Sequence, residues 1–205
     1  RTLFSLFLSK IKSMRNLAFI IIFATIFTMT SQEKLPYYEI PEAAKEFTPG
    51  TTASRMVDGL GFRYYWATEG LTKKDLVFKP SKEARSMFDT LDHILVLSIM
   101  TLSSVEGTEM IFPKEDSLSF NEIRKLTLEN FKKTSDILKV SNDISKMIMK
   151  IKRKNGEVEE FPFWNQLNGP IADAIWHTGQ VVSFRRSSGN PFPKGVSVLR
   201  GTKSD

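Results

Sequence analysis

The residues best suited to chemistry lie near the C-terminal end of the sequence. Asp173 and His177 stand four residues apart within residues 168–186, which read as one helix. This spacing places a carboxylate and an imidazole one turn apart on the same helix face. Both can therefore reach one cation if a third ligand comes from elsewhere in the chain. Gln180 follows on the same helix and is a candidate for hydrogen bonding to a metal ligand or to a substrate.

The only other histidine in the sequence is His93, which lies in a second predicted helix from Ser86 to about Ser104. Ser86 with Asp89 three residues later has the pattern of a capping box, which marks a helix N-terminus. His93 falls beside the apolar stripe of this helix. A polar ring in apolar surroundings needs partners for its nitrogens, either a hydrogen bond in the core or a metal ion. Taken alone, a histidine in this setting is more often a hydrogen-bonded core residue.

The helix over 168–186 has signals at both of its ends. Asn168 is placed to cap the first turn, and Pro170 suits the first helical position. Arg185 and Arg186 lie in the last turn, where positive charge favours the C-terminal end of the helix dipole. We expect them to cap the helix, the alternative being that they anchor an anionic substrate.

Two more helices are predicted earlier in the chain. Apolar residues with a 3.6-residue period predict one over residues 51–70. Within it, Gly59 and Gly61 would permit the close approach of a neighbouring helix or of a cavity floor. Ser119 and Glu122 form a capping box that begins the other helix.

A small hairpin is predicted before the last helix. Apolar and polar residues alternate over 147–163 around Asn155 and Gly156, which predicts two strands joined by a type I′ turn. In that register Lys152 lies opposite Glu159, a favourable cross-strand pair. The predicted fold class is therefore all-α, a four-helix bundle with a small β-hairpin before the last helix.

The sequence divides into three predicted parts. Residues 1–31 form a signal peptide or membrane anchor with an upstream extension, and residues 32–50 form a linker punctuated by prolines. Residues 51–205 form the bundle and its tail. We expect the tail, residues 190–205, to cross the bundle surface as irregular chain and to cover the mouth of the site.

The first part of the chain has the composition of a secretory signal. Arg15 precedes the apolar run 17–27, which is too short to span a bilayer comfortably, and small polar residues near Thr30 and Ser31 suit cleavage by a signal peptidase. Met14 would then be the natural initiator. We therefore expect a protein exported to the periplasm or beyond, the alternative being a protein anchored in the membrane by an uncleaved N-terminal segment.

Composition excludes several classes of function. The isoelectric point is about 9.4, but residues 1–31 hold four bases and no acid, and the remaining 25 bases and 23 acids leave a net charge of only +2. This small net charge does not indicate a basic surface that would bind the phosphate backbone of nucleic acid. The absence of cysteine excludes disulfides, thiol nucleophiles, thiolate metal sites and a lipoprotein whose lipid is attached to cysteine.

The segment Leu91-Asp92-His93-Ile94, together with the segment from Asp173 to Gln180, resembles the DinB/YfiT family of metalloenzymes over roughly residues 55–191. The resemblance implies a four-helix bundle in which a histidine of the second helix and a pair spaced four apart on the fourth helix bind a divalent metal. His93 and His177 match two of these positions, the latter within a His-x-Gly-Gln signature. Asp173 stands where the family usually has a third histidine.

Two imidazoles and one carboxylate would leave positions on the ion open to water or substrate, and they suit Zn²⁺, Ni²⁺, Fe²⁺ or Mn²⁺. The predicted function is a metal-dependent hydrolase or transferase of an unknown small molecule, with water as the favoured nucleophile because an exported protein rarely meets cytosolic thiol cofactors. The alternatives are a non-catalytic metal- or ligand-binding module and a metal-free interaction bundle. In the metal-free bundle, Asp173 and His177 form a hydrogen bond with each other and His93 is a core histidine.

Trp176 is expected to pack in the core, and a two-fold homodimer is compatible with the fold.

Overall fold

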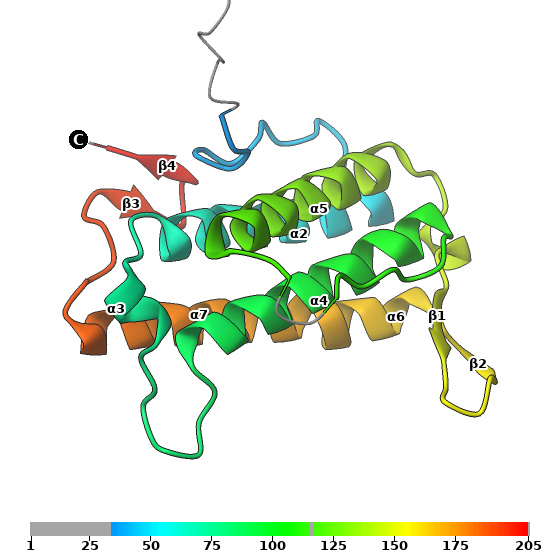
Figure 1. The fold of residues 1–205 in the computed structure, drawn as a ribbon. Coiled ribbons are helices and arrows are strands. Elements are labelled where there is room, and N and C mark those ends of the chain that lie inside the picture. The colour runs from blue at the N-terminus through cyan, green and yellow to red at the C-terminus, as the bar shows by residue number, and fades with distance from the viewer. Residues whose placement is uncertain (1–33, 115–116, 205) are drawn as a thin grey trace, which may run out of the picture. The chain divides into compact units, whose positions relative to one another are not determined.

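The computed structural model describes residues 34–114 and 117–204 (Figure 1). The predicted signal peptide or anchor, residues 1–31, lies outside the described residues. Leu35–Asp205 forms one unit.

Four long helices form the body of this unit, and they lie side by side in Figure 1. They are α2 (Pro49–Thr68), α4 (Met87–Glu106), α5 (Phe120–Val140) and α7 (Ala172–Ser188), with the short helix α3 (Lys73–Leu76) between α2 and α4. Helix α5 packs on α2 and α4, and α7 packs on the same two helices from the other side. The prediction of a mostly helical fold is therefore confirmed.

The predicted capping boxes define where two of these helices begin. Ser86 Oγ accepts the amide of Asp89 at 3.1 Å, and the Asp89 carboxylate accepts the amide of Ser86 at 3.0 Å. Ser119 and Glu122 make the same reciprocal pair at the start of α5. Each pair satisfies amides that the first helical turn leaves without partners, so these helix starts are set by local sequence.

Helix α4 is long and apolar enough to span a membrane by length and composition alone, but 61% of its apolar window is buried within the protein. Its buried residues face α5 and α7, and they include Leu91, Ile94 and Leu95. This pattern is that of a core helix.

The hairpin precedes the last helix, as predicted, but its register differs from the prediction. Strands β1 (Met149–Lys152) and β2 (Val158–Phe161) are antiparallel, with Lys152 opposite Val158 rather than Glu159. The Gly156 amide donates to the Arg153 carbonyl at 2.9 Å, and Gly156 has φ +88°. A type I′ turn needs a positive φ at Asn155 as well, and among the described residues only Tyr37 and glycines have one. The loop is therefore one residue longer than predicted, which shifts every cross-strand pair.

The last helix begins earlier than predicted and is interrupted. Helix α6 (Phe163–Gln166) continues through the π-helical segment η2 (Leu167–Ile171) into α7, and Gly169 (φ −99°, ψ −110°) makes a kink between them. The expected cap at Asn168 is wrong, because that residue already lies inside the helical segment. Helix α7 runs two residues beyond the predicted Arg186, and Gly189 closes it in the left-handed conformation at φ +95°.

Residues of the predicted linker pack onto the helices. Tyr37 is 3% exposed and donates its hydroxyl to Asp58 Oδ1 at 3.1 Å, and Ser135 of α5 donates to the same oxygen at 2.6 Å. The Tyr37 ring occupies the space that a side chain at Gly61 would fill. Gly61 thus permits a close approach, as predicted, but the neighbour is this segment.

The tail contains a second small ladder, β3 (Val196–Ser197) with β4 (Thr202–Lys203). The Gly201 carbonyl accepts the Ile40 amide at 2.9 Å. Part of the tail therefore lies against the segment that contains Tyr37. The short 3₁₀ turn η1 (Ile144–Lys146) links α5 to the hairpin.

Candidate metal centre

Three side chains that could bind a metal ion meet between α4 and α7. His93 comes from the second turn of α4, and Asp173 and His177 come from the first two turns of α7. One ligand atom from each residue can be chosen so that all three lie within 4.8 Å of one another. The structure therefore brings together the three residues that the sequence singled out, although 80 positions separate His93 from Asp173.

Asp173 lies between the two imidazoles. Its Oδ2 is 3.4 Å from His93 Nε2, and its Oδ1 is 3.4 Å from His177 Nε2. The two rings are nearly perpendicular, at 89°, with centroids 4.8 Å apart. Each histidine thus presents its Nε2 atom to a different oxygen of the same carboxylate.

These distances are long for direct hydrogen bonds and are compatible with an ion shared by the three side chains. A hydrogen bond from nitrogen to oxygen is usually about 2.9 Å long, so separations of 3.4 Å are long for that interaction. Two donor atoms that each lie about 2.1 Å from one ion and subtend about 90–109° are roughly 3.0–3.4 Å apart. The two measured pairs fall at the upper end of that range.

Gln180 determines which nitrogen of His177 can act as a ligand. Its Oε1 lies 2.8 Å from His177 Nδ1. An amide oxygen can only accept, so Nδ1 carries the proton, and the Nε2 of a neutral ring is left with a lone pair. Nε2 and the Asp173 carboxylate oxygen are then two acceptors that face each other, an arrangement that a cation between them stabilises.

The surroundings favour a neutral His93. Burial lowers the pKa of His93, and the positive charge of Arg85 lowers it further, against the opposing effect of the Asp173 carboxylate. Neutral imidazole is the form that binds metals. Arg85 was not singled out by the sequence analysis, although its position directly before the Ser86 cap, two helical turns from His93, is a signal that could have identified it.

The site is partly open to solvent. The exposed fractions of the side chains are 28% for His93, 35% for Asp173 and 15% for His177. Trp176 is 70% exposed and lies nearly parallel to the His177 ring, at 15° and 6.5 Å between centroids. The expectation that Trp176 packs in the core is therefore wrong. It lies on the face of α7 opposite the buried residues Ala174, Thr178 and Val181, beside His177 at the edge of the site.

Arg185 has a different role from either one expected of it. It is 2% exposed, and its guanidinium donates to the carbonyls of Trp66 and Ala67 at 2.9 and 3.0 Å and to Asn190. These carbonyls belong to the last turn of α2, where helical partners are lacking. Arg185 thus caps a neighbouring helix instead of its own, and its buried position does not suit the binding of an anionic substrate.

No family model and no curated protein matches this chain.

Proposed function

We propose that His93, Asp173 and His177 bind one divalent metal ion and that this ion supports the protein's activity. The observation that carries the proposal is the pair formed by His177 Nε2 and Asp173 Oδ1. His177 Nδ1 donates a hydrogen bond to Gln180 Oε1, so in the neutral ring His177 Nε2 and Asp173 Oδ1 meet as two acceptors at 3.4 Å. His93 Nε2 supplies a third donor atom at the same distance from the other carboxylate oxygen.

The donor set indicates which ions suit the site. Two imidazoles favour Zn²⁺, Ni²⁺, Fe²⁺ or Mn²⁺ over Mg²⁺ and Ca²⁺, which prefer oxygen ligands. A carboxylate in place of a third imidazole moves the preference towards the harder ions, Fe²⁺ and Mn²⁺. Three protein ligands leave coordination positions open, which is typical of catalytic sites. A bound ion would supply Lewis-acid chemistry there.

The residues that surround the three proposed ligands have different roles. Gln180 fixes the tautomer and the ring orientation of His177. Burial, with a smaller contribution from the positive charge of Arg85, lowers the pKa of His93 and favours the neutral ring that binds a metal ion. Trp176 forms one wall at the solvent side of the site.

We further propose a DinB/YfiT-type four-helix bundle that is exported and acts as a metal-dependent hydrolase or transferase on a small molecule. Four packed helices, with candidate ligands on the second and fourth of the long ones, support this family proposal. Export rests on the sequence of residues 14–31 alone, and the same residues would provide the only contact with a membrane.

A substrate panel tests the catalytic part of the proposal. The purified protein, freed of metal with a chelator and then loaded with Mn²⁺, Fe²⁺, Ni²⁺ or Zn²⁺ in turn, is assayed on ester, amide, lactone and phosphoester substrates. We expect turnover of at least one class that depends on the added ion and is lost in Asp173→Ala. Stoichiometric binding without turnover of any substrate would indicate a non-catalytic metal-binding module. Failure to bind any ion would leave a metal-free interaction bundle.

A further inference from the structure

A cavity of about 630 Å³ lies between the short helix α3 and the first turn of α4, and it opens widely to solvent. Cavities that bind small organic molecules have volumes of roughly 300–1,000 Å³. Its lining residues fall within 73–79 and 86–89, all of which the structure describes, and they do not include His93, Asp173 or His177. This cavity is therefore a separate feature from the candidate metal centre, although α4 contributes to both.

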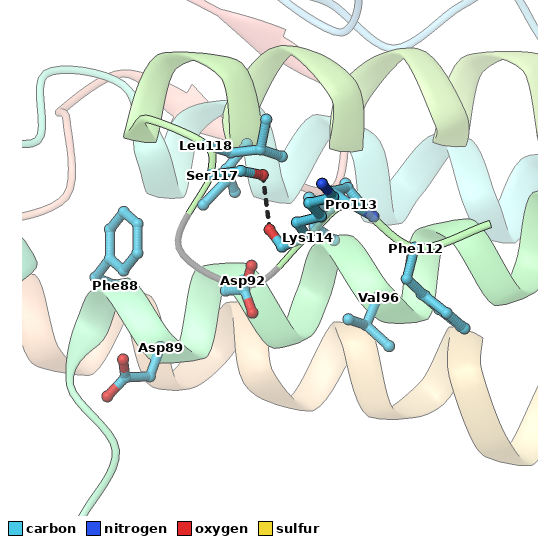
Figure 2. Close-up of a pocket in the computed structure, with 11 residues that line it drawn as sticks. Phe88, Asp89, Asp92, Val96, Phe112, Pro113, Lys114, Ser117 and Leu118 are labelled. Atoms are coloured by element: carbon cyan, nitrogen blue, oxygen red, sulfur yellow. Dashed lines mark hydrogen bonds between the residues drawn. The ribbon is translucent and has the colours of Figure 1, made fainter. Parts of the chain in front are cut away.

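Part of the lining is apolar and unusually exposed. Val77 is 74% exposed, and Leu76 and Phe88, which also line the cavity, are only half-buried. Figure 2, which draws a neighbouring cavity, shows the side chains of Phe88 and Asp89 pointing in different directions from the first turn of α4. Apolar side chains gain free energy when they leave water. An apolar ligand that covers Val77 and Leu76 would therefore be stabilised here.

Positive side chains gather at this cavity because the backbone closes a loop beside it. The Met87 amide donates to the Phe78 carbonyl at 3.0 Å. This bond joins the two ends of the loop 79–85, so Lys79 and Arg85, its first and last residues, both lie at the start of α4. Lys73 of α3 also lines the cavity. Three basic side chains from two separate segments are thus brought to one place.

These basic side chains are available to a ligand. Lys73, Lys79 and Arg85 are exposed, and within residues 34–114 and 117–204 no hydrogen bond or ion pair holds any of them. Asp89 is the one acid of the lining, and its carboxylate accepts the Ser86 amide at 3.0 Å. The hydrogen bonds from Ser86 lower the pKa of Asp89 most, and the charges of Lys79 and Arg85 lower it further. Three positive charges therefore surround one negative charge, a balance that attracts an anion.

We propose that this cavity binds a small molecule that carries one anionic group, a carboxylate or a phosphate, on a short apolar chain. The anionic group would lie between Lys79 and Arg85, and the apolar chain would cover Val77 and Leu76. Arginine suits both anions, because its planar guanidinium can donate two parallel hydrogen bonds to either. An amine with the same apolar chain would meet three positive charges and does not belong to this class.

Three ligands with the same apolar chain test the proposal: hexanoate, hexyl phosphate and hexylamine. Their dissociation constants are measured by titration into the ¹⁵N-labelled protein, followed by amide chemical shifts. At an open site of this kind we expect a dissociation constant of roughly 0.1–3 mM for the tighter anion and at least about fivefold weaker binding of hexylamine. Tighter binding of hexyl phosphate would identify phosphate esters as the preferred ligands, and otherwise carboxylates are preferred.

Variants of exposed residues locate the site without disturbing the core. Lys79→Gln and Arg85→Gln are each expected to weaken binding of the tighter anion about twofold to fivefold, and the double variant about tenfold. Val77→Ser removes apolar surface and should weaken binding about threefold. Lys133→Gln removes the same charge from an exposed position on α5 and should leave binding unchanged. Circular dichroism spectra check that all variants are folded.

The charge of Arg85 also acts on His93, so binding at the metal centre must be distinguished from binding in this cavity. The titrations therefore use protein freed of metal ions with a chelator, and Asp173→Asn is expected to bind the anion as wild type does. The proposal is overturned if hexylamine binds within about fivefold of the tighter anion or if neither anion binds below about 10 mM. It is also overturned if the double variant binds like wild type or if Asp173→Asn loses binding. Because no metal ion is present in these titrations, failure of this proposal leaves the proposed metal centre standing.

Discussion

His177 Nδ1 and Gln180 Oε1 lie 2.8 Å apart on successive turns of α7. A hydrogen bond of this kind sets the orientation of the imidazole and directs its second nitrogen towards Asp173. The orientation of His177 as a metal ligand therefore depends on a contact within one helix, α7. The third donor atom, His93 Nε2, comes from α4.

Removal of the Gln180 oxygen should weaken metal binding. Gln180→Leu keeps the approximate size of the side chain but leaves His177 free to rotate or to protonate Nε2, so we expect a 10–100-fold loss of affinity. Gln180→Glu retains an acceptor and should retain most of the affinity, and Ser187→Ala serves as an exposed control on the same helix. The measurement is competition with a chromophoric chelator. Equal affinities of wild type and Gln180→Leu would show that the hydrogen bond has no part in ligand orientation.

Arg185 and Arg186 are adjacent in sequence but should differ sharply in their effect on stability. Arg185→Leu leaves the carbonyls of Trp66 and Ala67 buried without partners, so we expect the free energy of unfolding to fall by about 3–5 kcal/mol. Arg186 is exposed, and Arg186→Leu should change the free energy of unfolding by less than about 0.5 kcal/mol. Urea unfolding measures both. Similar values for the two variants would contradict the role given to Arg185.

Two glycines of α2 provide a second matched pair. A side chain at Gly61 would overlap the Tyr37 ring, so Gly61→Ala should displace that ring, break its bond to Asp58 and cost about 1–3 kcal/mol. At Gly59 a new Cβ meets only the flexible end of Arg63, so Gly59→Ala should stabilise the helix by about 0.5–1 kcal/mol. Thermal unfolding gives both values. A stabilising effect of Gly61→Ala would show that the Tyr37 segment is not firmly held.

Asp75 should make folding stability depend on pH in the acid range. Burial favours the neutral form of this carboxyl group, but hydrogen bonds from Ser188, Asn190 and Thr72 outweigh burial and hold its pKa well below the usual range. Because the pKa is lower in the folded state, the unfolded state binds a proton more readily. The stabilisation that ionised Asp75 gives the folded state is therefore complete above about pH 5. It is lost as the pH falls below about 4 towards the folded-state pKa.

Asp75→Asn should lack this pH dependence, and Ser188→Ala should show a smaller version of the same change because it removes one of the bonds. Urea unfolding between about pH 2 and 6 measures the slope. If the wild type and Asp75→Asn lose stability equally on acidification, carboxyl groups other than Asp75 determine the pH dependence, and the prediction is contradicted.

The features predicted correctly from the sequence are those that depend on near neighbours. Ser86 with Asp89, and Ser119 with Glu122, are pairs three residues apart, and each marks a helix start where the structure has one. The spacing of Asp173 and His177 is also local, and it places both side chains on the face of α7 that meets α4.

The features predicted wrongly depend on backbone conformations or partners that the sequence pattern does not specify. Asn168 and Pro170 have the residue types of a helix start, but the preceding residues of α6 are already helical, and a π-turn joins the two parts. Asn155 and Gly156 suit two kinds of hairpin loop, and the backbone of Asn155 decides between them. Arg185 meets carbonyls more than 100 residues away, which its position in the last turn of α7 could not reveal.

The most direct test of the proposed centre is the amount of metal that the protein binds. Metal-free protein is dialysed against Mn²⁺, Fe²⁺, Ni²⁺ or Zn²⁺, the bound ion is measured by mass spectrometry, and the thermal unfolding temperature is recorded with and without the ion. We predict about one equivalent in wild type with a rise in unfolding temperature, and neither effect in His93→Ala, Asp173→Asn or His177→Ala. Less than about a tenth of an equivalent of every ion in wild type, with no thermal shift, would contradict the account.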